Sequence, residues 1–314
     1  MAAKQKRIVV AINPNASSGK GRHVGPAVIA SLRGMGHEVQ PLIEADYLSL
    51  VESGRAAVAT KPDALVVVGG DGMVNLGTNL VGGSKVPLGI VPSGTGNDMA
   101  RGLGIPIDNT ERAIAIIEEA LGRPPKSIDA GRVTPADRHS GEQKQTWFAC
   151  LVSAGFDAIV NERANMWTYP KGPSRYNLAL LYELVRMKPI SYTLTMDGVE
   201  SSFQASLITI ANNQSLGGGM LVTPNAKVDD GLLDVLIVEK LGRAAFLRIF
   251  PRVYRGEHLS DRRVTVTHAK HVVINATGIS ATADGETLGG LPLDIQIVPG
   301  ALRVLAPLTA PAFS

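Results

Sequence analysis

The N-terminal part of the chain alternates between short apolar runs and longer segments in which apolar residues recur every three or four positions. The short runs predict strands over 7–14, 37–43, 64–68 and 87–91, and the periodic segments predict helices over 22–35, 48–60, 74–80, 97–103 and 110–121. Strands that alternate with helices through short turns indicate a mostly parallel sheet with helices on both faces. We therefore predict an α/β, doubly wound, Rossmann-like N-terminal domain.

The alternation of strands and helices ends at Arg123–Pro125, after which apolar runs of strand length follow one another closely. Strands are predicted over 126–133, 147–153, 191–196, 203–211, 232–238, 263–266, 271–275 and 293–298, with helices over 175–187 and 244–255 and a polar surface loop over 134–145. Such spacing indicates a β-rich C-terminal sandwich domain. The predicted boundaries are 1–131 and 132–299, with 300–314 free to pack back on the first domain.

Composition narrows the class of protein only a little. A hydrophobic content of 45% with 19% charged residues indicates a globular chain rather than a disordered one. The net charge of +3 gives a mild preference for anionic partners. The single cysteine excludes an internal disulfide and favours a cytoplasmic protein. No apolar run approaches the ~18 residues of a membrane span, so we expect any membrane contact to be peripheral.

Two of the predicted strands end in glycine-rich turns that carry acids. The turn at 69–72 reads Gly-Gly-Asp-Gly, and the turn at 93–98 reads Ser-Gly-Thr-Gly-Asn-Asp. Backbone N–H groups in such turns, next to a helix N-terminus, suit a phosphate group. Since Asp71 and Asp98 have the wrong charge to touch phosphate directly, a divalent cation is the natural mediator. We therefore predict that this stretch holds Mg-ATP.

The chain carries further blocks in a distinctive order. Asn13-Pro14 with Ser18-Gly19 precedes the two glycine turns, and KSIDAG at 126–131, a Gly-Gly-Gly and Asp-Gly-Leu block within 211–238, and Ala-Asp-Gly-Glu at 283–286 follow them. The whole series resembles the signature blocks of diacylglycerol kinases and related lipid kinases. The resemblance implies an NAD kinase/phosphofructokinase-like α/β domain for the nucleotide and a β-rich domain for the lipid. It also assigns to ATP the residues Asn13, Ser18, Gly19, Gly69, Gly70, Asp71, Gly72, Gly94, Thr95, Gly96 and Asn97.

The same resemblance implies roles for the acids. Asp71, Asp98 and Asp129 would surround a catalytic Mg²⁺, and Glu286 would be the general base with Asp284 as its polar support. A second, structural Mg²⁺ would be bound by Asp230 and by the backbone of Lys227 and Leu232. From the residues alone, ordinary alternatives stay open. Asp98 fits a helix N-cap, and Asp-Gly-Glu at 284–286 fits a type I′ hairpin turn.

Two positions depart from the pattern that the resemblance implies. Met73 stands where the glycine turn is usually followed by Thr, and Leu76 stands where Glu usually follows Asn75. A hydroxyl near the phosphates and one acid are therefore missing. We still expect activity, because neither change removes a proposed metal ligand or the base.

The resulting prediction is a lipid kinase that uses ATP and Mg²⁺ to convert diacylglycerol to phosphatidic acid. Alternatives are a kinase of a sphingoid or other lipid alcohol, an NAD kinase, and an inactive lipid- or nucleotide-binding regulator. The expected location is cytoplasmic and peripheral, on the anionic inner face of the cell membrane, with no nucleic-acid partner and with a homodimer left open. The basic, apolar segment Leu241–Leu259 fits membrane contact and domain packing equally well.

Overall fold

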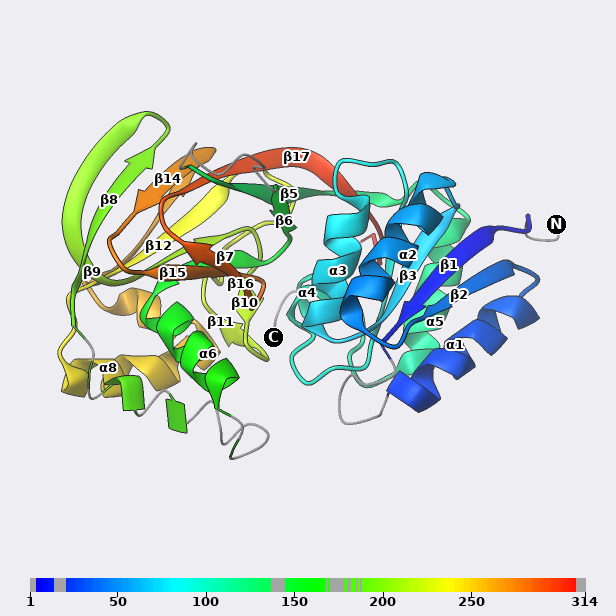
Figure 1. Ribbon diagram of the computed structural model, residues 1–314, viewed down its shortest axis with the longest axis horizontal. Coiled ribbons are helices and arrows are strands. Elements are labelled where there is room, and N and C mark those ends of the chain that lie inside the picture. The colour runs from blue at the N-terminus through cyan, green and yellow to red at the C-terminus, as the bar shows by residue number, and fades with distance from the viewer. Residues whose placement is uncertain are drawn as a thin grey trace. The chain divides into compact units, whose positions relative to one another are not determined.

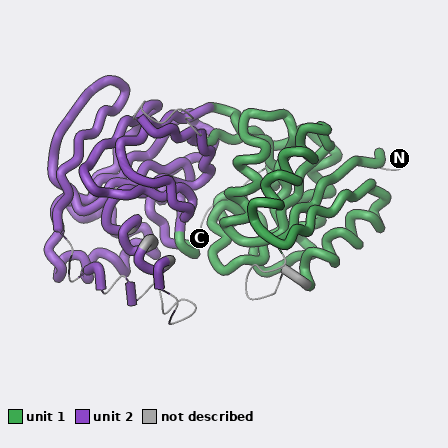
Figure 2. The backbone as a smooth tube through the Cα atoms, viewed as in Figure 1, with its two compact units in different colours: residues 1–130, 217–219, 299–314 green, residues 131–216, 220–298 purple. Residues whose placement is uncertain are grey.

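The computed structural model describes residues 4–13, 21–136, 145–167, 169, 178–179, 182–184, 186 and 188–308. The described residues form two compact units (Figures 1 and 2). The first unit comprises residues 1–130, 217–219 and 299–314, and the second comprises residues 131–216 and 220–298. Two strands, β5 and β17, each begin in one unit and end in the other.

The first unit is built on a parallel sheet with the strand order β2-β1-β3-β4. These strands are β1 (Arg7–Ile12), β2 (Glu38–Ile43), β3 (Ala64–Gly69) and β4 (Leu88–Pro92). The end of β17 (Leu293–Leu305) adds to β4 in parallel. The helices are α1 (Gly21–Gly34), α2 (Tyr47–Ala59), α3 (Asp71–Val81), α4 (Asp98–Gly102) and α5 (Thr110–Leu121).

Helices cover both faces of this sheet. Side chains of α1 and α5 join those of β1 and β3 in one buried cluster. Helices α2 and α3 contribute nothing to that cluster; they contact each other, and α2 also contacts β1 while α3 contacts β3. Every residue of β3 is buried, as expected for a central strand between two helical layers. The predicted doubly wound α/β fold of this part of the chain is therefore confirmed.

The second unit is a β-rich sandwich of mostly antiparallel strands in the order β16-β15-β7-β9-β8-β14-β17, with β12 paired to β9 and β13 paired to β12. Its strands are β5 (Lys126–Pro135), β6 (Thr146–Phe148), β7 (Leu151–Gly155), β8 (Ile190–Met196), β9 (Val199–Ala211), β12 (Leu233–Glu239), β13 (Val264–Ala269), β14 (His271–Asn275), β15 (Ser280–Ala283) and β16 (Glu286–Gly290). Two short strands, β10 (Ser215–Leu216) and β11 (Met220–Leu221), pair as a hairpin. The helices are α6 (Phe156–Met166), α8 (Arg243–Ile249) and the 3₁₀ turns η2 (Phe250–Arg255) and η3 (Glu257–Ser260).

Strands β7, β9 and β12 separate two apolar clusters in the second unit. Because side chains alternate along a strand, Val152, Ile208 and Val235 enter the sandwich core. Leu236 and Val238 enter a second cluster with α6 and α8. Figure 1 shows these two helices together on one side of the strands.

Several elements differ from the prediction. The predicted helix 244–255 is divided into α8 and η2, where Pro251 removes a backbone N–H. The predicted strand 293–298 continues to Leu305, past the Pro299-Gly300 that ended the apolar pattern. Helix α6 was not predicted, whereas the hairpin turn left open at 284–286 is present between β15 and β16. Residues 14–20 lie outside the described residues, as do much of the predicted helix 175–187 and most of the predicted loop 134–145.

Candidate active site

The two glycine turns of the first unit lie against each other at the carboxyl ends of neighbouring strands. The turn after β3 leads into α3, and the turn after β4 leads into α4. The N–H of Ser93 donates to the carbonyl of Gly69 at 2.9 Å. A Cβ atom added to Gly94 would stand 2.3 Å from the Cα of Gly70. Glycine is therefore required because the two backbones touch, leaving no room for a side chain.

Asp71 connects the first turn to the second. Its carboxylate accepts the backbone N–H of Asn97 at 2.9 Å and that of Asp98 at 2.7 Å. Asn97 adopts a left-handed conformation with φ of 58°, and its side-chain amide accepts from and donates to the backbone of Gly94. The turn 93–98 is thus shaped by one carboxylate and one carboxamide. This arrangement also explains why an acid stands between glycines at position 71.

Asp98 is buried and receives two further N–H groups. Those of Gly218 and Gly219, between β10 and β11, donate to its carboxylate at 2.8 Å each. Burial raises the pKa of Asp71, and the nearby charge of Asp98 raises it further. A cation beside these two neighbouring carboxylates would favour the ionised form of Asp71, and the oxygen chemistry of the pair fits Mg²⁺.

The third predicted acid of the catalytic site, Asp129, is also buried, on β5. Its carboxylate accepts the N–H of Gly300 at 2.8 Å. Within the described part of the chain, no three acidic, histidine or cysteine side chains are grouped so that they could hold one metal ion. The structure thus brings Asp71 and Asp98 together and leaves Asp129 as a predicted ligand.

The other residues predicted to contact ATP vary in exposure. Asn13 lies just after β1, half-buried, and borders a small pocket with Glu44, Asp46 and Tyr47. Thr95 is exposed at the tip of the second turn. Ser18 and Gly19 lie outside the described residues.

Met73 and Leu76, the two departures from the expected pattern, are core residues of α3. Both are buried, and the Met73 side chain packs so closely over Gly69 that a Cβ there would meet it at 2.4 Å. Neither position is exposed at the turn itself. Where the usual pattern has a hydroxyl and an acid, this chain has two apolar side chains that pack beneath the turn.

In the second unit, Asp284 and Glu286 belong to the β15–β16 hairpin. Asp284 and Gly285 both have positive φ, which is the geometry of a type I′ turn. The buried carboxylate of Asp284 accepts three backbone N–H groups, those of Ala149, Cys150 and Leu151, at 2.8 to 2.9 Å. Glu286 is exposed beside it at the start of the edge strand β16. Asp284 therefore anchors the turn, and Glu286 keeps a solvent-accessible carboxylate.

The predicted structural Mg²⁺ site lies in the loop before β12. Asp230 is exposed, and its carboxylate accepts the N–H of Leu232 at 3.1 Å. Lys227 is exposed in the same loop. A carboxylate with free access to solvent and nearby backbone carbonyls is compatible with an oxygen-bound cation. This second site remains a prediction.

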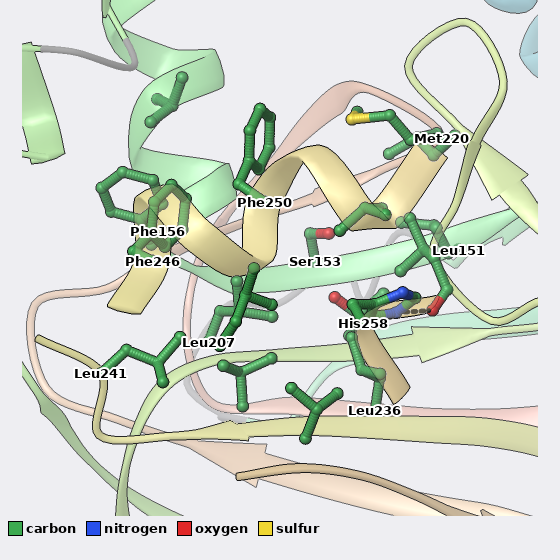
Figure 3. A pocket seen from close by; sticks show the side chains of 18 residues that line it. Leu151, Ser153, Phe156, Leu207, Met220, Leu236, Leu241, Phe246, Phe250 and His258 are labelled. Carbon is green, nitrogen blue, oxygen red and sulfur yellow. Dashed lines mark hydrogen bonds between the residues drawn. The ribbon is translucent and has the colours of Figure 1, made fainter. Parts of the chain in front are cut away.

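The second unit also contains an apolar cavity that the sequence did not predict (Figure 3). The cavity volume is about 120 Å³. Its walls come from β7, β9, β12, α6, α8 and η2. The side chains Phe246 and Ile249 of α8 line it and are buried, so these two residues of Leu241–Leu259 pack within the unit. Arg243, Arg248 and Arg255 of this segment are exposed.

Comparison with known proteins gives a consistent answer. The diacylglycerol kinase catalytic domain matches residues 7–133, and the YegS C-terminal NAD kinase β-sandwich-like domain matches residues 150–306. A diacylglycerol kinase of Mycobacterium tuberculosis is 37% identical over 302 residues, covering 96% of this chain and 95% of its own. The chain belongs to the diacylglycerol kinase family. The predicted resemblance is thereby confirmed, and so is the prediction that the protein is a lipid kinase.

More distant relatives support the same fold. A diacylglycerol kinase of Bacillus subtilis is 27% identical over 244 residues, with 76% of each chain covered. The crystal structure of a diacylglycerol kinase from Bacillus anthracis superposes with a TM-score of 0.71 at 21% identity, covering 98% of this chain and 99% of that one. Yeast NADH kinase superposes with a TM-score of 0.58 at 12% identity, covering 96% and 83%. The NAD kinase-like architecture is therefore confirmed.

Proposed function

We propose that this lipid kinase transfers the γ-phosphoryl group of ATP to the hydroxyl of diacylglycerol, giving ADP and phosphatidic acid. The observation that carries the proposal is the pair of glycine turns joined through Asp71 and Asp98 at the carboxyl edge of a parallel sheet. Ligands of doubly wound sheets bind at this edge, and backbone N–H groups there suit phosphate. The identity of the relatives points to diacylglycerol as the acceptor.

Each acid has a part in this proposal. Asp71, Asp98 and Asp129 would hold Mg²⁺, which supplies neutralisation of phosphate charge when bound. Glu286 takes the proton of the lipid hydroxyl as that oxygen forms its bond to the γ-phosphorus. The bond from the γ-phosphorus to the bridging oxygen breaks, and ADP leaves with the electron pair. Asp284 contributes by fixing the turn that presents Glu286.

One partly exposed segment of the second unit, residues 243–255, is suited to binding a membrane surface. Leu247 and Tyr254 are exposed beside Arg243, Arg248 and Arg255, so apolar and basic groups share one short segment. Each basic side chain near an anionic membrane contributes about 1 kcal/mol of attraction. Among the described residues, no helix is long and apolar enough to cross a bilayer. We therefore propose a peripheral position on the cytoplasmic face of the cell membrane.

The test is a kinase assay with γ-labelled ATP, Mg²⁺ and dioleoylglycerol in detergent micelles, with the lipid product identified by mass spectrometry. Phosphatidic acid is the expected product, and chelation by EDTA should reduce its formation to background. Glu286→Gln should lower kcat at least about 100-fold without changing the melting temperature. Asp71→Asn should lower kcat to a similar extent and also lower the melting temperature, because one of the two N–H groups bound by Asp71 loses its acceptor.

Matched exposed acids provide the controls. Asp108→Asn in the first unit and Glu200→Gln in the second should retain full activity, because both side chains are exposed outside the proposed site. Near-normal turnover by Glu286→Gln would overturn its role as the base. Labelling of a sphingoid alcohol but not of dioleoylglycerol would mean that the acceptor is a sphingoid alcohol and not diacylglycerol. ATP binding without any labelled lipid would indicate a regulator, although the buried positions of Met73 and Leu76 remove the main reason to expect one.

A further inference from the structure

The cavity of the second unit has an apolar wall interrupted by polar side chains. Along β7 and β9, alternate residues line the cavity, and two of these four side chains, Leu151 and Leu207, are apolar. Ser153 and Thr209 are the other two. They lie directly opposite each other on the paired strands, so their side chains leave the sheet on the same face. Figure 3 shows the Ser153 hydroxyl among the residues that line the cavity.

These polar groups are buried without a protein partner. Ser153 is 2% exposed and Thr209 is 1% exposed, and neither hydroxyl has a hydrogen-bond partner among the described residues. His258, which lines the same cavity and is equally buried, has an unpartnered Nδ1. Buried polar groups in folded proteins are nearly always paired, so three exceptions around one cavity point to a ligand with polar atoms.

The hydrogen-bonding capacity of the three side chains can be assigned. His258 Nε2 lies 2.9 Å from the carbonyl oxygen of Val222, so Nε2 carries the hydrogen and Nδ1 is an acceptor. Each hydroxyl can donate one hydrogen bond. The paired hydroxyls of Ser153 and Thr209 therefore present two donors to one place in an otherwise apolar space. The group that fits two donors beside an apolar chain is a carbonyl oxygen.

The cavity is also connected to the proposed base. Leu151, at the start of β7, makes two hydrogen bonds with Asp284: its N–H donates to the side-chain carboxylate, and its carbonyl accepts the Asp284 N–H. Ser153 is two residues further along the strand, or about 7 Å. In an acylglycerol, the ester carbonyls are only a few bonds from the free hydroxyl. A carbonyl at Ser153 would thus leave the hydroxyl near the turn that carries Glu286.

We infer that the cavity holds an acyl chain through its ester, with the hydroxyls of Ser153 and Thr209 donating to the ester carbonyl oxygen. This inference rests on the proposed function and deepens it, because it assigns recognition of the acyl ester to the side chains of Ser153 and Thr209. Ether lipids and sphingoid bases have no such carbonyl. With either of them, the two hydroxyls would stay buried and unpaired, which disfavours binding.

The test compares dioleoylglycerol with its 1,2-di-O-oleyl ether analogue in the same micelles, since the two lipids differ only in the carbonyl oxygens. We expect the unmodified enzyme to favour the ester by about tenfold in kcat/KM. The double variant Ser153→Ala/Thr209→Val should lose this preference through a slower reaction of the ester, with the ether reaction unchanged. Each single variant should lose part of the preference, so the test stands if the double variant fails to fold.

A control and a second measurement make the outcome specific. Thr282→Val is the matched control, because Thr282 is buried opposite Ser153 but does not line the cavity, and it should keep the preference. Equilibrium gel filtration with tritiated forms of both lipids, without ATP, measures binding alone. Ester-selective binding that is lost in the double variant, without phosphorylation of either lipid, would refute the proposed function and support this inference. Equal binding and equal turnover of ester and ether would overturn the inference and leave the lipid kinase intact.

Discussion

The turn cluster of the first unit and the cavity of the second unit are built in opposite ways. The turn cluster takes its main residues from two short stretches, 69–72 and 93–98, each at the end of a strand. The cavity takes its walls from strands and helices spread over residues 151–264. The first is polar and held by hydrogen bonds to backbone, and the second is mostly apolar. A site at strand ends is thus encoded locally, whereas a cavity depends on how distant elements pack.

The two regions nevertheless share one device. Asp71 of the turn cluster accepts two backbone N–H groups, and Asp284, in the hairpin next to the cavity strand β7, accepts three. Acids that sequence patterns assign to catalysis therefore also hold the backbone in place. Variants of these residues and of their neighbours separate the contribution to catalysis from the contribution to stability.

The largest effect on stability is expected for Asp284→Ala. This change leaves three N–H groups without their acceptor, at about 1–3 kcal/mol for each group that stays buried. It also places alanine at a φ of 48°. We expect the free energy of unfolding to fall by about 4 kcal/mol, measured by urea denaturation, with activity lost in parallel.

Two further variants at the same hairpin separate the effect on stability from the effect on catalysis. Asp284→Asn keeps one acceptor oxygen and tolerates positive φ, so its loss of stability should be about half as large. Glu286→Gln should keep full stability, since Glu286 is exposed. Full stability of Asp284→Ala would mean that the turn does not depend on this carboxylate.

The next largest effect is expected for Gly94→Ala in the turn cluster. The new methyl group would stand 2.3 Å from the Cα of Gly70, so both turns must move. We expect a loss of about 3 kcal/mol of stability, at the upper end for overpacking. A displacement of about 1 Å at the site should also lower kcat/KM about 100-fold. Urea denaturation and the lipid kinase assay measure the two effects.

Gly34→Ala is the matched control for this variant. Gly34 ends α1 in the same unit, has no atom within 4 Å of an added Cβ, and lacks a positive φ. Alanine there should leave activity unchanged and stability equal or slightly higher. If Gly94→Ala behaved like Gly34→Ala, the close contact of the two turns would not matter for function.

The sequence was sufficient for the strands and turns of the first unit because their signals are local. Apolar runs such as Ala64–Val68 define buried parallel strands, and the glycine that follows this run marks its end. The contacts made by Asp98 could not be predicted this way. Its partners Gly218 and Gly219 are about 120 residues away and are brought to it only by the fold.

The cavity was beyond sequence reasoning for a related reason. Phe246 and Ile249 suggested an amphipathic helix, but whether that face meets a membrane or the sheet depends on packing. Ser153 and Thr209 did carry a signal, since each is a hydroxyl in a run of buried strand residues. Their pairing across β7 and β9 became visible only with the register.

The smallest expected effect concerns His258, the third polar group of the cavity. Burial lowers the pKa of His258 below its ordinary value of 6.5, and the charge of Arg252 lowers it further. The unfolded chain therefore takes up a proton near pH 6.5, while the folded protein takes it up only at lower pH. Stability contributed by neutral His258 is present above pH 6.5 and is lost as the pH falls below that value.

The change is limited to about 1.4 kcal/mol per pH unit for one proton, so we expect about 1 kcal/mol between neutral pH and about pH 5.5. Urea denaturation across this range measures it. His258→Gln keeps an N–H that can donate to the carbonyl of Val222 but cannot titrate, so its stability should depend less steeply on pH. His23→Gln is the control, because His23 is exposed, and it should keep the steeper dependence. If His258→Gln instead kept the slope of the unmodified protein, protonation of the cavity would not contribute to acid unfolding, and His258 could carry its charge in place.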